Sequence, residues 1–387
     1  MADDDVVIAG AGPAGSALAL RLARAGVKVR VVERSVFPRT KVCGEYLSPG
    51  ALRELETLGL GKRIAAHAAP CHGIRLYAAR GDPLALAFKD GEALALERCV
   101  LDAVLLEAAC AAGAFHERAR VEGVIVEHGR ATGLRVREPS GLLSERRGRV
   151  VVGADGIGSV VARRLGLARE VCAADERFAL GGHIRSAALD GWISMFAGAG
   201  AYFAVNPLGG ERANVMLVLR QREIAAWGGC VDVCARQRIA RLVGERAPLT
   251  LFPADGRRMA VGPLRQRVRR PDAPGALLVG DAAGFLDPFT GQGVWMALEG
   301  ARHAADAILG VLHGDVRERW AWRRYARACR RSWLPRWVLS SGIGLLRNRD
   351  GLAMRAIEQA RAHRTPATAL LGACAGRVSA LRRPPEQ

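Results

Sequence analysis

The residues whose spacing points most directly to chemistry are three glycines near the start of the chain. They form the pattern Gly-x-Gly-x-x-Gly at Gly10, Gly12 and Gly15, with Pro13 and Ala14 between the last two. In this pattern the first glycine permits a tight turn, the second lets the backbone approach a pyrophosphate, and the third lets a helix pack closely on a strand. The pattern therefore predicts a dinucleotide site with its phosphates at the start of a helix.

The elements that must position this site surround the glycines. Residues 5–9 are predicted to form a buried strand, residues 16–25 a helix, and residues 27–32 a second strand that ends at Glu33. Together they make a complete βαβ unit. Glu33 lies 18 residues beyond Gly15, where a carboxylate can accept hydrogen bonds from a ribose. Because this carboxylate would repel the extra phosphate of NADP, the unit favours FAD or NAD.

A second Gly-rich turn follows about 270 residues later. A buried strand is predicted at residues 276–279, with Asp281 directly after it and a helix opening at Val294. An aspartate at the end of a strand can bind the ribityl chain of a flavin, and a helix N-terminus offers N–H groups to its anionic reduced form. The two turns together predict non-covalently bound FAD, with its AMP half at the first turn and its flavin at the second.

The loop after the second predicted strand resembles a known flavoprotein family. Pro38, Arg39, Lys41, Cys43 and Gly44 match the Pro-Arg-x-Lys-x-Cys-Gly stretch of the geranylgeranyl reductase branch of the para-hydroxybenzoate hydroxylase-fold flavoproteins. The resemblance implies that this segment lies against the flavin and the substrate cavity, with Cys43 near the flavin. The alternative is that Cys43 is a loop cysteine packed against the sheet.

The resemblance extends to two further motifs. It implies that Arg98, which precedes a Leu-Asp pair, contacts FAD, and that Asp155 and Gly156 form a second contact near the pyrophosphate. Ala162 stands where the hydroxylases carry an arginine tied to NADPH use, so NADPH docking is in doubt. The electron donor is expected to be NAD(P)H or a partner reductase. The expected cofactor contacts are Gly10, Gly12, Pro13, Ala14, Gly15, Glu33, Arg34, Lys41, Cys43, Gly44, Arg98, Asp155, Gly156, Asp281, Pro288, Gly291, Gln292 and Gly293.

The expected substrate contacts rest on a partial match. Tyr202 and Pro207 match the ends of the family's Tyr-x-Trp-x-Phe-Pro segment, but Ala204 and Asn206 replace its inner aromatic residues. These replacements argue against an isoprenoid held as in the archaeal or plant reductases. The alternative is that Tyr202 is a half-buried strand residue.

The motifs predict an α/β fold in which a Rossmann-type FAD-binding domain carries an inserted antiparallel-sheet substrate domain and a helical C-terminus. The FAD-binding domain is expected to be discontinuous. The predicted ranges are 1–72, 98–167 and 271–310 for the FAD-binding domain, 73–97 and 168–270 for the substrate domain, and 311–387 for the helical region.

The first predicted helix of that C-terminal region carries both aromatic and basic side chains. It is expected to end at Leu334–Pro335. Such a helix either covers the core or lies on a membrane surface, and covering the core is the commoner arrangement. Its aromatic face holds Trp322, Tyr325, Cys329 and Trp333, and its arginines are Arg323, Arg324, Arg327, Arg330 and Arg331.

Composition limits the remaining possibilities. Of 387 residues, 50% are hydrophobic, and neither a signal peptide nor an apolar run of about 18–20 residues is present. A cytoplasmic protein, with membrane-peripheral placement possible, is therefore expected. The nine cysteines lack metal-ligand spacing, so no metal site is predicted. The net charge of +19 leaves room for an anionic partner such as a membrane surface or an acyl-carrier protein, while an aromatic content of 5% argues against nucleic acid.

The function expected from these residues is that of an FAD-dependent oxidoreductase. A monooxygenase acting on a hydrophobic aromatic or polyketide-like molecule is narrowly favoured, because most members of the fold are monooxygenases. The alternatives are a double-bond reductase of the geranylgeranyl reductase type and a basic peripheral protein with structural FAD. Cys43 and Pro288 are the candidate catalytic residues near the flavin, since no histidine or carboxylate pair stands out as a general base.

Overall fold

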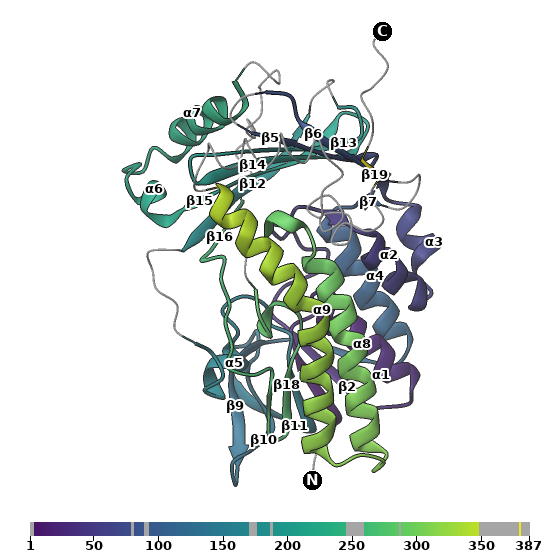
Figure 1. The fold of residues 1–387 in the computed structure, drawn as a ribbon. Coiled ribbons are helices and arrows are strands. Elements are labelled where there is room, and N and C mark those ends of the chain that lie inside the picture. The colour runs from purple at the N-terminus through teal and green to yellow at the C-terminus, as the bar shows by residue number, and fades with distance from the viewer. Residues whose placement is uncertain are drawn as a thin grey trace.

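Two eight-stranded sheets organise the chain, one below the other in Figure 1. Helices flank the lower sheet, and two helices lie on the outer side of the upper sheet. The structure is a computed structural model, and it describes residues 4–78, 81–88, 93–169, 176–185, 189–244, 259–285, 288–347 and 379–380.

The first sheet contains the βαβ unit expected from the glycine pattern. Strands β1 (Asp4–Ala9) and β2 (Val29–Glu33) are parallel and joined by helix α1 (Pro13–Arg24). The sheet order is β17-β18-β11-β1-β2-β8, and all neighbours from β18 to β8 are parallel. The remaining strands are β8 (Phe115–Arg118), β9 (Arg120–Glu127), β10 (Arg130–Arg137), β11 (Leu143–Gly153), β17 (Asp272–Ala273) and β18 (Ala276–Leu278).

Burial explains why these parallel strands read as continuous apolar runs. Val6, Val7 and Ile8 are fully buried, because α1 and its neighbours α4 (Arg98–Ala111) and α8 (Gly293–Leu312) pack beside the sheet. The site-forming ends of β1 and β18 are thereby held at one edge of a rigid layer.

The second sheet draws seven of its eight strands from residues 73–97 and 168–270. Its order is β16-β12-β15-β14-β13-β5-β6-β19. Helices α6 (Gln221–Ala225) and α7 (Val231–Val243), which the sequence pattern did not predict, follow β15, and α7 packs on β13 and β14. The strands are β5 (Gly73–Tyr77), β6 (Leu84–Ala87), β12 (Arg177–Arg185), β13 (Trp192–Gly198), β14 (Ala201–Gly209), β15 (Arg212–Arg220), β16 (Met259–Val261) and β19 (Ser379–Ala380).

A small three-stranded sheet and several short helices complete the described chain. The small sheet has the order β3-β7-β4. Its strand β3 directly follows the loop of residues 34–45, which we call the Cys43 loop. The small sheet therefore holds the C-terminal end of this loop. The elements are β3 (Tyr46–Leu47), β4 (Ala69–Pro70), β7 (Leu94–Ala95), α2 (Pro49–Thr57), α3 (Gly61–Ala65), α5 (Val160–Arg164), and the 3-10 helices η3 (Gly280–Ala282) and η4 (Pro288–Thr290).

The long C-terminal helix α9 (Glu318–Arg347) covers the core, as expected. Its Tyr325 is fully buried and donates a hydrogen bond to the Leu278 carbonyl at 2.6 Å. The predicted end at Leu334–Pro335 is wrong, because the helix runs on to Arg347. A proline removes one hydrogen bond and can bend a helix without ending it, and α9 changes direction along its length in Figure 1.

The region beyond α9 is only partly covered by the structure. The short strand β19 pairs with β6, so this pair of residues departs from the all-helical C-terminal region predicted. The rest of the predicted helical region beyond Arg347 lies outside the described residues.

Candidate functional site

A cavity lies between the two large sheets, and it brings together most of the predicted cofactor contacts. Those lining it are Gly12, Pro13, Ala14, Lys41, Cys43, Gly44, Arg98, Gly156, Asp281, Pro288, Gly291, Gln292 and Gly293. These residues come from the Cys43 loop, the ends of β1, β11 and β18, and the starts of α1, α4 and α8. Separated parts of the chain therefore form one site.

The three glycines of the first turn have different roles. Gly10 has a φ of +100°, and a Cβ on Gly15 would lie 1.9 Å from the Gly10 carbonyl oxygen. Both glycines are therefore required by the fold itself and do not line the cavity. A Cβ on Gly12 would meet only the Arg39 side chain, at 3.5 Å. Gly12 is the residue that leaves space for a ligand at the start of α1.

Glu33 stabilises this turn from a position outside the cavity. Its buried carboxylate accepts hydrogen bonds from the N–H groups of Ala11 (3.1 Å) and Ser35 (2.9 Å), and it pairs with Arg39 at 3.2 Å. Burial alone would raise the pKa of Glu33, but Arg39 and these N–H donors outweigh it and lower the pKa below its ordinary value. The predicted contact with a ribose stays a prediction, since Glu33 does not line the cavity. Arg34 is exposed and also lies off the cavity.

Asp155 acts on a helix instead of facing the cavity. Its carboxylate accepts hydrogen bonds from the Ser159 hydroxyl and from the N–H groups at the start of α5, of which that of Val160 lies at 2.6 Å. The neighbouring Gly156 faces the cavity. Of the predicted Asp-Gly pair, the glycine is therefore the member placed to meet a ligand.

Charged side chains gather where the two Gly-rich turns meet. Arg98 is buried and donates two hydrogen bonds to Asp102, both 2.9 Å long. Burial opposes its charge, but Asp102 and the adjacent Cys43 thiol raise the pKa of Arg98. Burial also lowers the pKa of Lys41 and raises the pKa of Asp281, although Lys41 and Arg98 lower that of Asp281. The result is a cavity wall with two cations around one carboxylate.

Two asparagines that sequence reasoning did not select hold the Cys43 loop in place. The Asn206 side-chain amide donates to the carbonyls of Gly44 (2.8 Å) and Glu45 (3.0 Å), and that of Asn214 donates to the Cys43 carbonyl at 2.6 Å. The two asparagines are directly opposite each other on β14 and β15. Each asparagine stands in an otherwise apolar strand, where a buried amide needs a hydrogen-bond partner. This polar residue within an apolar run is the sequence signal that could have identified them.

Glu45 fastens the same loop to two further elements. It has a φ of +54°, which is unusual for a residue with a side chain. Its carboxylate accepts a hydrogen bond from the Arg98 N–H at 3.0 Å and lies 2.7 Å from His183 Nε2 on β12. The hydrogen bond with Glu45 is the main cause of a raised pKa at His183; Glu97 adds to it, and burial and Arg212 oppose it.

The wall formed by the second sheet is apolar. It consists of Ala179, Met216, Val261 and Leu264, so it suits a hydrophobic substrate. Tyr46 also lines the cavity, and its buried hydroxyl has no hydrogen-bond partner in the described part of the chain. Sequence reasoning did not select Tyr46.

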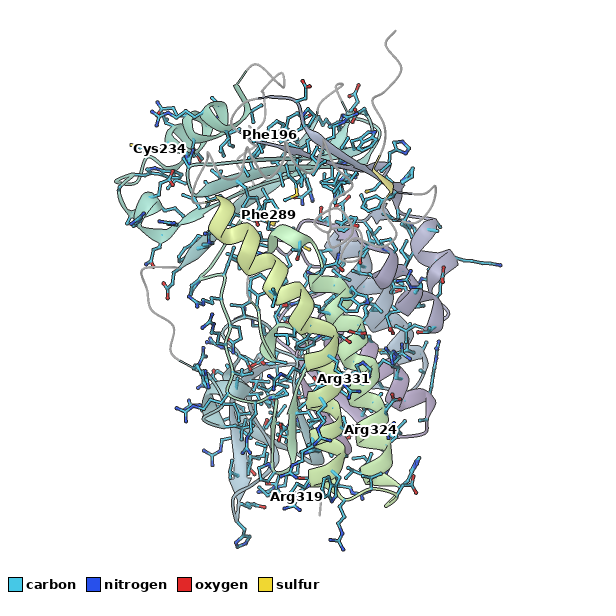
Figure 2. All side chains as sticks on the ribbon, viewed as in Figure 1. Phe196, Cys234, Phe289, Arg319, Arg324 and Arg331 are labelled. Atoms are coloured by element: carbon cyan, nitrogen blue, oxygen red, sulfur yellow. The ribbon has the colours of Figure 1, made fainter. Side chains whose placement is uncertain are left out.

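The predicted substrate residues Tyr202 and Pro207 do not line this cavity. The Tyr202 ring packs edge-on against Phe289 of η4, with 5.0 Å between ring centroids, and Figure 2 shows Phe289 next to the second sheet. Pro207 is buried on β14 opposite Ala213. Their position behind the cavity wall, set by packing between distant elements, corrects the expectation of direct contact.

Two features of the cavity fit FAD, and a third explains why the turn before α8 needs a glycine. The N-cap residues of α1 and α8, Gly12 and Gln292, form no side-chain capping hydrogen bond, so the first N–H groups of these helices suit a pyrophosphate and a reduced flavin. The Asp281 carboxylate faces the cavity and accepts no hydrogen bond from the described residues, which leaves it for ribityl hydroxyls. Gly291 packs so closely on the Tyr46 ring that a Cβ would lie 2.8 Å from it.

The fold and the cavity define an FAD-dependent oxidoreductase. Comparison with known families agrees, because the model of the FAD binding domain family matches residues 3–332. The chain belongs to this family, and the predicted resemblance to the geranylgeranyl reductases is confirmed.

Two relatives in sequence are reductases, and a solved structure that superposes on the chain is a monooxygenase. The chain is 30% identical over 323 residues (80% of this chain, 78% of the relative) to digeranylgeranylglycerophospholipid reductase 2 of Methanopyrus kandleri. It is 30% identical over 353 residues (82% and 79%) to menaquinone reductase of Mycolicibacterium smegmatis. The solved structure of PqsL, a probable FAD-dependent monooxygenase from Pseudomonas aeruginosa, superposes with a TM-score of 0.74 at 23% identity, over 90% of this chain and 98% of that chain. This last likeness shows the fold alone.

Two further observations concern other kinds of site. Across the described ranges, no helix is both long and apolar enough to cross a membrane. In that same portion of the chain, no cluster of His, Cys, Asp and Glu side chains is arranged to hold a metal ion.

The glycine geometry gives a first prediction. Gly15→Ala should destabilise the FAD-free protein by about 1–3 kcal/mol, because its Cβ meets backbone. Gly12→Ala should leave that stability within about 0.5 kcal/mol but weaken FAD binding at least about tenfold. Urea unfolding and calorimetric titration with FAD measure the two effects. Wild-type FAD affinity in Gly12→Ala, or wild-type stability in Gly15→Ala, would contradict these roles.

The His183–Glu45 pair gives a prediction about pH. Because the pKa of folded His183 lies above its unfolded value, the pair stabilises the fold fully below about pH 6.5 and less as the pH rises through the folded-state pKa. His183→Gln should therefore cost about 1 kcal/mol near pH 5.5 and distinctly less near pH 8.5. Urea unfolding at both pH values tests this, with the exposed His67→Gln as control. The prediction would be wrong if the loss of unfolding free energy in His183→Gln did not decrease with rising pH.

Proposed function

We propose that the chain is an FAD-dependent reductase of carbon–carbon double bonds in an apolar substrate, most simply an isoprenoid chain carried by a lipid or a quinone. The observation that carries this proposal is the position of Cys43, which lies beside Arg98 and lines a cavity that is apolar on the side of the second sheet. A thiol next to a cation, facing an apolar chamber, suits the delivery of a proton to a hydrocarbon.

The relatives support reduction more than hydroxylation. Sequence motifs alone narrowly favour a monooxygenase. However, two relatives with 30% identity over about four fifths of the chain are named as reductases of a lipid and of a quinone, while the monooxygenase likeness lies in the fold alone. The Asn206 replacement, first read as evidence against an isoprenoid, has another role, because its amide binds the Cys43 loop.

The chemistry of the cavity can be divided among its residues. Reduction of a double bond adds a hydride to one carbon and a proton to the other; bound FAD, once reduced, supplies the hydride. Cys43 gives the proton, and the adjacent Arg98 stabilises the thiolate that remains until a proton returns from solvent. Lys41 and Asp281 lie close together, where they hold the ribityl end of the cofactor.

Tyr46 is a second candidate proton donor that lines the cavity. Burial raises the pKa of its hydroxyl well above the ordinary value, which disfavours release of its proton. Its role would be to hydrogen-bond a polar group of the substrate. NAD(P)H or a partner reductase remains the expected electron donor. Position 162 is a fully buried alanine where the hydroxylases carry an arginine, so it offers no cation to NADPH.

An anaerobic assay tests the proposal. The FAD-loaded protein, reduced with dithionite, is mixed without oxygen with a geranylgeranyl phospholipid, and products are analysed by mass spectrometry. We expect a product that has gained two hydrogen atoms. Cys43→Ser should slow its formation at least about 100-fold, whereas Tyr46→Phe should slow it less than about tenfold.

Two outcomes would contradict reduction. A product that has gained one oxygen atom, formed only in air, would establish the second candidate, a monooxygenase. A flavin that is reduced but never reoxidised by any substrate or by oxygen would favour the third, a protein with structural FAD. Equal effects of Cys43→Ser and Tyr46→Phe would remove Cys43 as the proton donor.

A further inference from the structure

The solvent-facing side of α9 is strongly basic. At about 100° per residue, six of its arginines fall within about 140° of the helix circumference, opposite the buried aromatic stripe. We call this surface the outer face of α9, and Figure 2 shows three of its arginines spread along the helix. All six arginines are exposed: Arg319, Arg323, Arg324, Arg327, Arg330 and Arg331.

The charge of this face is not neutralised by neighbouring carboxylates. Within the described ranges, none of the six arginines forms an ion pair. Arg323 lies near Asp272 and lowers its pKa in opposition to burial, but the two side chains are not paired. By contrast, arginines on the first sheet pair with glutamates, as Arg146 does with Glu117. The positive charge of α9 is therefore available to an external partner.

Large apolar side chains interrupt the arginines. Trp320 and Leu334 are 49% and 46% exposed, and both lie near the middle of the arginine arc; Val338, one turn further on, is 61% exposed. Arg319 and Arg323 lie over the Trp320 ring at 5.5 and 5.3 Å. Arginines flanking an exposed tryptophan and aliphatic residues are the pattern of a helix that lies in a membrane interface.

We propose that the outer face of α9 docks the protein on an anionic phospholipid surface. Guanidinium groups bind lipid phosphates in paired hydrogen bonds, Trp320 sits at headgroup level, and Leu334 and Val338 enter the acyl boundary. A nucleic acid would use the arginines but not the exposed aliphatic side chains, and an acidic carrier protein would need no such length of helix. The proposal does not depend on whether the reaction is reduction or hydroxylation.

The position of α9 connects this surface to the cavity. The helix contacts η4, whose Pro288 and Thr290 line the cavity. A protein docked through α9 therefore holds one wall of its cavity close to the lipid surface. This arrangement would suit a substrate that is delivered from a bilayer.

Vesicle binding tests the proposal with matched charge changes. The FAD-loaded full chain is sedimented with vesicles of phosphatidylcholine alone or mixed with phosphatidylglycerol. We expect binding only to the mixed vesicles. Arg327→Glu with Arg331→Glu should weaken it at least about 25-fold, at about fivefold per arginine removed. Arg236→Glu with Arg241→Glu on α7, both exposed, changes the net charge equally and should weaken it less than about threefold.

A second variant separates the apolar contribution from the charge. Trp320→Ala should weaken vesicle binding while leaving its salt dependence unchanged, because no charge is removed. Flavin content and thermal unfolding confirm that each variant is folded. The proposal is overturned if the wild type does not bind anionic vesicles, if the α9 and α7 variants lose binding equally, or if the α9 substitutions abolish binding of duplex DNA but not of vesicles.

Discussion

Two side-chain amides join the second sheet to the Cys43 loop on the charged side of the cavity. Asn206 and Asn214 stand opposite each other in the second sheet and donate hydrogen bonds to three successive carbonyls of the Cys43 loop. Breaking these bonds would leave buried polar groups without partners, at about 1–3 kcal/mol each. The loop and the sheet therefore fix each other's position.

The rest of the site depends on this attachment. Glu45, in the same loop, binds the first N–H of α4 and meets His183 of β12. Arg98, the first residue of α4, is locked onto Asp102 and lies beside Cys43. The cofactor side of the cavity is thus polar and charged, the other side is apolar, and Cys43 is held where the two sides meet. This division is what a flavin enzyme with a hydrophobic substrate requires.

Local sequence signals selected most of the residues on the charged side of the cavity, because each of them lies in or next to its own motif. The glycine pattern requires only a strand, a turn and a helix that are adjacent in the chain, and Asp281 follows its strand directly. Predictions failed where distant packing decides the outcome. Tyr202 is buried against Phe289, far from it in sequence, and does not line the cavity. Asn206 and Asn214 were missed because their partners lie more than 160 residues away.

The most direct test of this account is the chemical accessibility of Cys43 when the two amides are removed. The alkylation rates of Cys43 and of the exposed Cys110 are measured by mass spectrometry on the FAD-loaded wild type and on the Asn206→Ala, Asn214→Ala double variant. Loss of the anchoring hydrogen bonds should raise the Cys43 rate at least about tenfold and leave the Cys110 rate unchanged. An unchanged Cys43 rate would show that the asparagines do not hold the loop, and the central role given to them would be wrong.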